Sequence, residues 1–267
     1  MSLKSIHTVP KNSTLGSGTL QNVKKVFGME GTGDLMAVKD VSFSFSGGQV
    51  ISLLGPSGCG KTTVLKMIGG LIDATSGTIT VANSLVKGPY ENIGMVFQTP
   101  TLMPWRSVVS NIKFPLEVLG KRIDSLKEKV ERLIKLTSLD GFSNALPHEL
   151  SGGMQQRVAL CRALIHSPEI LLMDEPFGAL DELTRMEMND LLLKINYQEK
   201  NTVIFVTHSI SEAIYLSDTV HVFSKRPAEI LKTINISLPH PRKPTDRYTN
   251  LFKQLELDAG EALGVIR

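Results

Sequence analysis

Residues 55 to 63 combine glycines, a lysine and hydroxyl side chains at a spacing that suits phosphate binding. The segment Gly55-Pro-Ser-Gly-Cys-Gly-Lys-Thr62 fits the pattern G-x-x-x-x-G-K-[ST]. Glycines let backbone N–H groups converge on phosphate oxygens, and a helix that begins here adds a favourable dipole. We expect Lys61 to reach the β- and γ-phosphates of a nucleotide, Thr62 to bind Mg²⁺ and Thr63 to contact the α-phosphate. The predicted nucleotide ligands are Gly55, Pro56, Ser57, Gly58, Cys59, Gly60, Lys61, Thr62 and Thr63.

Two adjacent acids, Asp174 and Glu175, follow the apolar run Ile170–Met173. A carboxylate at the carboxyl end of a buried strand beside a phosphate loop is placed to hold Mg²⁺, usually through water, and we assign this role to Asp174. Glu175 can face the attacking water and orient or deprotonate it. The alternative is a solvated acidic turn, which the nearby phosphate loop disfavours.

A second anion-binding helix start is predicted within Leu150-Ser-Gly-Gly-Met-Gln-Gln-Arg157. Ser151, Gly152 and Gly153 place a capping hydroxyl and two small residues before a helix predicted over Met154–Ile165. A plain N-capped helix has the same composition. One phosphate loop and one separate anion site in a single chain nevertheless require an explanation.

Short apolar strands alternate with helices around these motifs. Strands are predicted at Val41–Phe45, Val50–Leu54, Thr78–Val81, Ile170–Met173, Thr202–Thr207 and Thr219–Phe223, and helices at Lys61–Ile68 and Asp181–Gln198. Continuous apolar strands indicate an α/β fold with a parallel sheet covered on both faces. Such a sheet holds the phosphate loop between a strand and a helix.

The chain divides by composition into a lead-in, a main domain and a tail. Residues 1–19 are rich in Ser, Thr, Gly and Asn and predict a flexible lead-in, residues 20–241 the main domain and residues 242–267 a short tail. Residues 105–168 predict a helical insert, because apolar residues recur there at helical spacing: Leu126, Val130, Leu133, Ile134 and Leu136. Basic residues near the end are interpreted as a solvated face, with contact to anionic lipid as the alternative: Lys225, Arg226, Arg242 and Lys243.

The composition excludes several classes of protein. The 267 residues are 42% hydrophobic and 21% charged, which excludes a mainly disordered chain. A net charge of +3 excludes a highly charged nucleic-acid wrapper. The cysteines Cys59 and Cys161 are too few for a disulfide scaffold. Cys59 is either a redox-sensitive thiol or a small residue packed in a tight loop. No apolar run approaches the roughly 20 residues that span a bilayer, and we expect a cytosolic location.

These motifs together resemble the ATP-binding cassette of ABC transporters, whose signature reads L-S-G-G-Q. Here Met154 stands where that Gln is most frequent, and Gln155-Gln156 follow. The resemblance implies a P-loop NTPase (RecA-like) core with a small antiparallel β subdomain and an inserted α-helical subdomain, so that residues 20–241 form an ATPase domain. It also implies four further roles. Phe27 stacks on adenine, Gln98 senses Mg²⁺ and water, Asp181 belongs to a loop that crosses a dimer, and His208 contacts the γ-phosphate.

The resemblance also implies the partners. The family works as a head-to-tail pair, in which the phosphate loop of one subunit and Ser151 and Gly153 of the other hold each ATP. Glu175, His208, Gln98 and Lys61 are then the predicted catalytic residues, and Thr62, Gln98 and Asp174 the metal ligands. The implied assembly is a homodimer on the cytoplasmic face of the cell (inner) membrane, bound to a separate permease and served indirectly by a solute-binding protein. No nucleic-acid partner is expected.

A Pro-bounded loop holds the single Trp of the chain and is the predicted permease contact. Leu102, Met103 and Trp105 form either an apolar socket for a partner helix or local packing beneath the loop. The run from Phe97 to Arg106 resembles importers of the nitrate, sulfonate and taurine group.

Other functions share some of these motifs. A soluble ABC ATPase of cofactor assembly or DNA repair is the main alternative, although repair types need a long coiled coil. A small-molecule kinase would have a phosphate loop but would not need the segment Leu150–Gln156. An efflux pump is a third alternative, whose cassettes are often fused to membrane spans.

Overall fold

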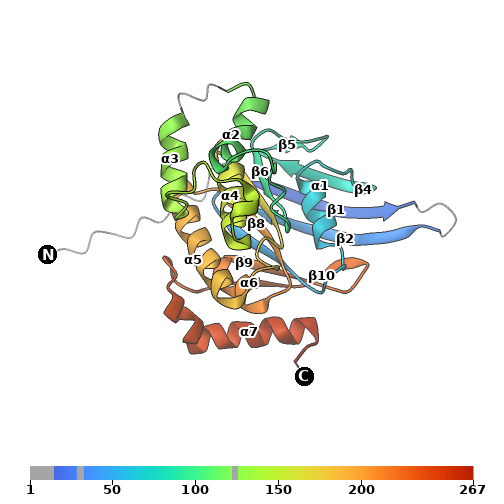
Figure 1. Ribbon diagram of the computed structural model, residues 1–267. Helices are drawn as coiled ribbons and strands as arrows, with labels where there is room; N and C mark the ends of the chain where they lie inside the picture. The colour runs from blue at the N-terminus through green and yellow to red at the C-terminus, as the bar shows by residue number, and fades with distance from the viewer. Residues whose placement is uncertain (1–14, 29–32, 122–125, 267) are drawn as a thin grey trace.

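The strands form one mixed sheet. The computed structural model describes residues 15–28, 33–121 and 126–266, and within these the sheet order is β5-β4-β1-β2-β10-β9-β3-β8-β7-β6 (Figure 1). The strands are β1 Gly18–Phe27, β2 Leu35–Phe45, β3 Val50–Leu54, β4 Ser76–Val81, β5 Ser84–Leu85, β6 Ile93–Val96, β7 Ile170–Asp174, β8 Thr202–Thr207, β9 Thr219–Phe223 and β10 Ala228–Asn235.

Parallel and antiparallel pairing divide the sheet into two regions. Strands β9, β3, β8, β7 and β6 pair in parallel, whereas β5, β4, β1 and β2 pair antiparallel. Strand β10 joins the regions, because it lies parallel to β2 and antiparallel to β9. The expected α/β fold, with a parallel core and a small antiparallel subdomain, is confirmed.

Helices cover both faces of the parallel core, which explains why its strands are apolar at every position. On β7, Ile170 and Leu172 pack in the same cluster as helix α1 (Lys61–Ile68). The alternate residues Leu171 and Met173 pack in the opposite cluster, which includes helices α4 (Gly152–Leu164), α5 (Glu182–Glu199) and α6 (Ile210–Leu216). Because the strands of this core run parallel, the loops at their carboxyl ends meet at one edge of the sheet.

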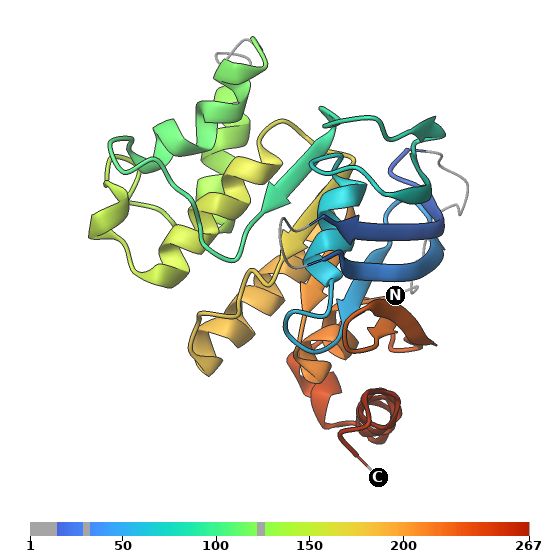
Figure 2. The ribbon, with the colours of Figure 1, turned by 90° about the vertical axis from the view of Figure 1, so that its right-hand side faces the viewer.

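The insert between β6 and β7 is helical, as expected. It contains α2 (Val108–Val118), α3 (Lys127–Leu136), the 3₁₀ turn η2 (Pro147–Glu149) and α4. Val130, Leu133 and Ile134 of α3 are buried, while Leu126 and Leu136 are partly buried. Figure 2 shows these helices (green to yellow) on the side of the molecule away from β1 and β2 (blue).

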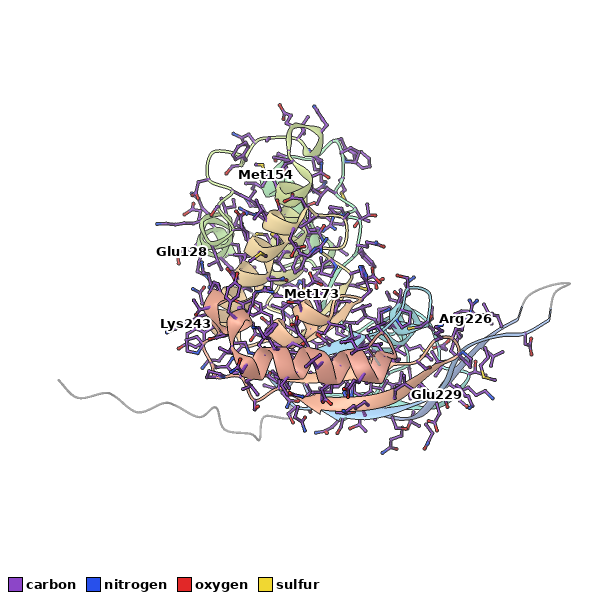
Figure 3. All side chains as sticks on the ribbon, turned by 90° about the horizontal axis from the view of Figure 1, so that it is seen from below. Glu128, Met154, Met173, Arg226, Glu229 and Lys243 are labelled. Atoms are coloured by element: carbon purple, nitrogen blue, oxygen red, sulfur yellow. The ribbon has the colours of Figure 1, made fainter. Side chains whose placement is uncertain are left out.

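The C-terminal segment, which we expected to be a short tail, forms a helix that packs against the main domain. After the 3₁₀ turn η3 (Pro244–Tyr248), helix α7 (Asn250–Leu263) packs against α6, β9 and β10 (Figures 1 and 3). Phe252, Leu255 and Ala259 are buried in the same core as α5 and α6. The interpretation of Arg242 as part of a solvated face is wrong: its guanidinium is buried and donates to the carbonyls of Ile214, Tyr215 and Ser217 at the end of α6.

The first described residues are bonded to the main domain. Strand β1 begins at Gly18, inside the segment 1–19 that we expected to be a flexible lead-in; residues 1–14 of that segment lie outside the described residues. The Gly16 N–H donates to Glu169 Oε2 at 3.3 Å, and Thr202 Oγ1 donates to the Gly16 carbonyl at 2.7 Å. Among the described residues, no helix is long and apolar enough to span a bilayer.

Candidate functional site

The phosphate loop connects β3 to α1 and depends on glycine at two positions. Gly58 and Gly60 have φ angles of +72° and +123°, which side chains disfavour. A Cβ on Gly60 would also lie 2.6 Å from the Ala37 carbonyl oxygen and 2.9 Å from the Ala228 Cβ. The loop is thus held between β2 and β10, and its conformation requires the glycines that the motif prescribes.

Lys61, the first residue of α1, is folded into this loop. Only 3% of the residue is exposed. Its ammonium donates to the Gly55 and Pro56 carbonyls at 2.8 Å each and lies 3.8 Å from Cys59 Sγ. An ammonium has three donors, and the two carbonyl bonds keep the charge at the loop; the third donor reaches only the weak sulfur acceptor, which a phosphate oxygen would replace. Burial of Cys59 in the core favours the interpretation of this residue as a small side chain packed in a tight loop.

A cavity of about 190 Å³ opens above the loop. Its lining combines the loop with an apolar wall and two charged residues: Phe27, Leu35, Ala37, Gly58, Cys59, Gly60, Lys61, Thr62, Thr63, Glu175 and Arg226. Phe27 ends β1 with 36% of its surface exposed, and the Lys25 ammonium lies 4.9 Å from its ring centroid. An exposed aromatic ring near a phosphate loop offers a stacking surface for a planar base.

Arg226, which we expected on a solvated face, lines this cavity. It belongs to the turn between β9 and β10, and β9 lies parallel to β3, which leads into the phosphate loop. Loops after neighbouring parallel strands meet at one edge of the sheet. Since the strand Thr219–Phe223 was predicted from the sequence, this rule could have placed Arg226 near the phosphate loop.

Thr62 and Asp174 meet although 112 positions separate them. Thr62 Oγ1 donates to Asp174 Oδ1 at 2.6 Å, joining the start of α1 to the end of β7. Burial raises the pKa of Asp174 and the neighbouring Glu175 charge adds to this shift, while the Thr62 hydrogen bond opposes it. A hydroxyl and a carboxylate are hard oxygen ligands, and Mg²⁺ commonly binds one or two carboxylates together with phosphates. These residues fit a magnesium ion, which would also offset the repulsion between the two acids.

Glu175 lies beside His208 at the ends of neighbouring strands. His208 Nδ1 and Glu175 Oε2 are 3.1 Å apart. Glu175 has a φ of +43°, an unusual backbone conformation that functional sites often contain. A Cβ on Gly178 would lie 3.6 Å from Glu175 Oε2 and 3.8 Å from Gln98 Nε2, so the glutamine is also near. The arrangement can orient a water molecule between a carboxylate, an imidazole and an amide.

The remaining predicted site residues cap helices elsewhere. Ser151 Oγ accepts from the Met154 N–H at 3.3 Å and caps α4. Asp181 caps α5 by accepting from Thr184 N at 3.0 Å and Thr184 Oγ1 at 2.7 Å, and these bonds lower the pKa of its carboxyl. The two helix starts touch, because a Cβ on Gly153 would lie 2.8 Å from Thr184 Cγ2.

These helix starts lie away from the cavity. Ser151, Gly152, Gly153 and Asp181 are absent from the described residues that line it. Figure 3 shows Met154, next to the two glycines, well separated from Arg226. The predicted nucleotide ligands therefore form two groups, of which only one lines this cavity.

Residues 38–178 match the ABC transporter family. The chain belongs to this family. The chain is 39% identical over 249 residues to the aliphatic sulfonates import ATP-binding protein SsuB of Bacillus thuringiensis subsp. konkukian, covering 93% of this chain and 98% of that protein. It is 43% identical over 218 residues to the taurine import ATP-binding protein TauB of Pelagibacter ubique, covering 81% of this chain and 82% of that protein.

A solved structure agrees with the fold of this ABC transporter subunit. It is described as the dimeric structure of a post-hydrolysis state of the ATP-binding cassette MJ0796 bound to ADP and Pi. It matches with a TM-score of 0.72 and 31% identity, covering 83% of this chain and all of that one. The expected P-loop NTPase fold and the expected ABC-type ATPase are confirmed.

Proposed function

We propose that this ABC ATPase is the ATP-hydrolysing subunit of an importer for a small anion such as nitrate, a sulfonate or taurine. Its relatives named for sulfonate and taurine import support this solute class. The observation that carries the catalytic part is the convergence of Glu175, His208 and the Thr62–Asp174 pair beside the phosphate loop. The subunit acts on the cytoplasmic face of the cell (inner) membrane, where ATP is available.

ATP binding uses residues whose positions suit each part of the nucleotide. Phe27 stacks on the base, and the loop N–H groups with Lys61 bind the phosphates. Thr62 and Asp174, with Gln98, would hold Mg²⁺, and the ion would supply positive charge to neutralise the phosphates. Glu175 takes a proton from the attacking water, and its contact with His208 keeps the carboxylate directed toward the γ-phosphate position.

A second copy of the chain completes each site. Ser151 and Gly153 lie at the start of α4, where the first N–H groups of a helix lack intrahelical partners, a feature suited to binding a phosphate. Neither residue is among the described residues that line the cavity. A head-to-tail homodimer brings the helix start of one subunit to the phosphate loop of its partner. ATP then favours the closed pair, and removal of the γ-phosphate favours opening.

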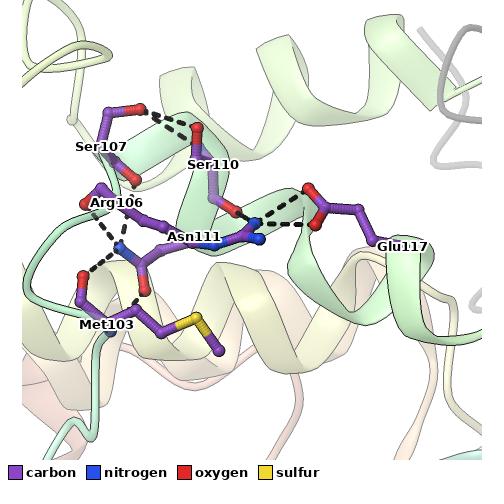
Figure 4. A network of polar contacts seen from close by, with 6 residues as sticks. All are labelled: Met103, Arg106, Ser107, Ser110, Asn111 and Glu117. Carbon is purple, nitrogen blue, oxygen red and sulfur yellow. Dashed lines mark hydrogen bonds and ion pairs between the residues drawn. The ribbon is translucent and has the colours of Figure 1, made fainter.

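The permease contact is the loop between β6 and α2. Asn111 is only 1% exposed, and its side chain accepts from Met103 N and donates to the carbonyls of Met103, Arg106 and Ser107 (Figure 4). Arg106 forms an ion pair with Glu117 at 2.8 Å. This polar network fixes the loop while Trp105 remains 76% exposed. A rigid loop that presents a large apolar ring is suited to receive a helix of a membrane partner.

Affinity purification from membranes tests the proposal. The tagged chain is extracted with mild detergent, and the proteins that co-purify are identified by mass spectrometry. We expect a multi-span permease, encoded near a solute-binding protein. Trp105→Ala should reduce its recovery, whereas Tyr248→Ala, which removes another exposed ring at 73% exposure, should not. Recovery without any membrane partner would favour a soluble ABC ATPase of cofactor assembly or repair.

A further inference from the structure

The residues that flank His208 form a closed ring of hydrogen bonds. Thr207 Oγ1 donates to Glu212 Oε2 at 2.6 Å and accepts from Ser209 N at 3.0 Å. Ser209 Oγ in turn accepts from Glu212 N at 3.3 Å. His208 stands between Thr207 and Ser209, so the ring fixes the backbone on both sides of its imidazole.

Glu212 is an unusual residue for the interior of a helix-sheet interface. It is 6% exposed, and its second oxygen, Oε1, is buried without a hydrogen-bond partner among the described residues. Burial raises the pKa of its carboxyl, while the Thr207 hydrogen bond opposes this shift. Cationic or titratable neighbours also oppose it: Arg185, His208 and Arg247. Since a buried carboxylate is unfavourable without partners, its position requires an explanation other than packing.

The two arginines that act electrostatically on Glu212 come from two separate parts of the chain. Arg185 of α5 donates to the Phe177 carbonyl at 3.4 Å and the Leu180 carbonyl at 2.9 Å, in the loop that follows Glu175. Arg247 belongs to the C-terminal segment, and its Cζ lies 3.6 Å from the Tyr215 ring centroid. The Nη2 atom of Arg247 is also buried without a hydrogen-bond partner among the described residues. The charge of Glu212 is thus influenced both from the loop that follows Glu175, through Arg185, and from the C-terminal segment, through Arg247.

We propose that Glu212 is the positioning residue for His208: its carboxylate fixes the Thr207 hydroxyl, and through it the backbone that directs the imidazole toward Glu175. This inference rests on the role proposed above for His208. The contact also has a second connection to the site, because the Thr207 carbonyl accepts from Gly55 N at 3.4 Å in the phosphate loop. Loss of the ring would misplace His208 relative to both Glu175 and the phosphate loop.

The test compares steady-state ATP hydrolysis by the full chain and its variants, with kcat and KM determined separately. Glu212→Ala removes the acceptor, and we expect kcat to fall about tenfold, the effect of losing one hydrogen bond to a charged group, with little change in KM. Glu212→Gln keeps an acceptor oxygen and should retain most activity. Tyr215→Phe is the matched control, since it removes a 2.6 Å hydrogen bond to Asp190 from the same helix and should leave kcat unchanged.

Combination with His208→Ala separates positioning from general destabilisation. In that background Glu212→Ala should lower kcat no further, because both changes remove the same function. An equal further loss in that background would overturn the inference, as would wild-type kcat for Glu212→Ala alone.

Thr207 provides an independent pair of variants in case Glu212→Ala does not fold. Thr207→Val removes the hydroxyl and should reproduce the loss in kcat. Thr207→Ser keeps the hydroxyl and should retain the wild-type kcat. Equal kcat for the two would overturn the inference. Full activity of His208→Ala would overturn the role of His208 and the inference with it. Loss of activity in His208→Ala with none in the Glu212 and Thr207 variants would overturn the positioning role alone.

Discussion

His208 Nδ1 lies 3.1 Å from Glu175 Oε2, and this contact joins two loops that leave adjacent parallel strands. Glu175 follows β7, and its backbone N–H donates to the Val206 carbonyl of β8 at 3.0 Å. The register of these strands therefore sets the distance between the carboxylate and the imidazole. Because side chains alternate between faces along a strand, a shift of one residue would turn the two groups away from each other.

Replacement of Glu175 tests its role as the base. Glu175→Gln preserves size but removes the proton acceptor, so we expect ATP-driven dimerisation to persist while turnover falls by roughly 10²- to 10⁴-fold. Light scattering with and without MgATP reports dimerisation, and phosphate release reports turnover. Glu229→Gln is a suitable control, because that acid forms a surface ion pair with Lys39. Full hydrolysis by Glu175→Gln would exclude Glu175 as the base.

Arg226 is expected to contribute to nucleotide affinity. It lines the cavity together with Phe27 and the phosphate loop. Arg226→Ala should therefore raise KM for ATP by about fivefold, because it removes one exposed charge-assisted contact of ~1 kcal/mol. The effect on kcat should be smaller. Titration with a fluorescent ATP analogue measures the affinity directly. Lys225→Ala changes the neighbouring exposed cation, which lies outside the described lining, and equal effects of the two would point to general electrostatics.

The loop that carries Trp105 should loosen when Asn111 is changed. Asn111→Ala removes a buried amide that binds three residues of the loop, and we expect a loss of roughly 2–4 kcal/mol in the free energy of unfolding. Since Trp105 is the single tryptophan, its fluorescence anisotropy reports the loop directly. Ser110→Ala, on the same helix, should have a much smaller effect on both readouts. Unchanged anisotropy in Asn111→Ala would show that the network does not hold the loop.

His221 should make the fold sensitive to acid. Its imidazole is buried beside Phe43, with a ring-centroid distance of 4.5 Å, and burial lowers its pKa to about 4. Below the unfolded pKa of about 6.5 the unfolded chain binds a proton that the folded chain does not, so stability falls between about pH 6.5 and pH 4, by up to about 3 kcal/mol. Above this range the contribution is constant.

Urea denaturation at several pH values checks this expectation. In His221→Phe, which keeps an aromatic ring against Phe43, the free energy of unfolding should depend less on pH over that range. His148→Phe removes an exposed imidazole and should retain the acid-induced loss. The same pH dependence in wild type and His221→Phe would exclude His221 as its source.

Much of the candidate site could be predicted because its residues follow patterns within short segments of the sequence. The phosphate loop requires glycines and Lys61 at fixed spacing after a strand, and the structure has that loop between β3 and α1. Asp174 and Glu175 were predictable because two acids end an apolar strand. The roles of Phe27, Gln98 and His208 came from the family resemblance, since an aromatic, an amide or an imidazole alone indicates no specific chemistry.

Other residues were missed because their contacts join distant parts of the chain. Arg226 lines the cavity only because β9 pairs beside β3. Glu212 looks like an ordinary helical acid in the sequence, and its burial follows from the packing of α6. Arg242 was interpreted as solvated, yet it satisfies three carbonyls at the end of α6.

The sequence by itself determined the class of the fold and the chemistry of the phosphate loop, because strand periodicity and glycine spacing are local properties of the backbone. Only the tertiary structure decided which side chains meet. The 2.6 Å contact between Thr62 and Asp174, the ring around His208 and the attachment of α7 all depend on the order of strands in the sheet and on the burial it produces. Burial and strand order arise from contacts between residues far apart in the chain, so no short segment of the sequence contains them.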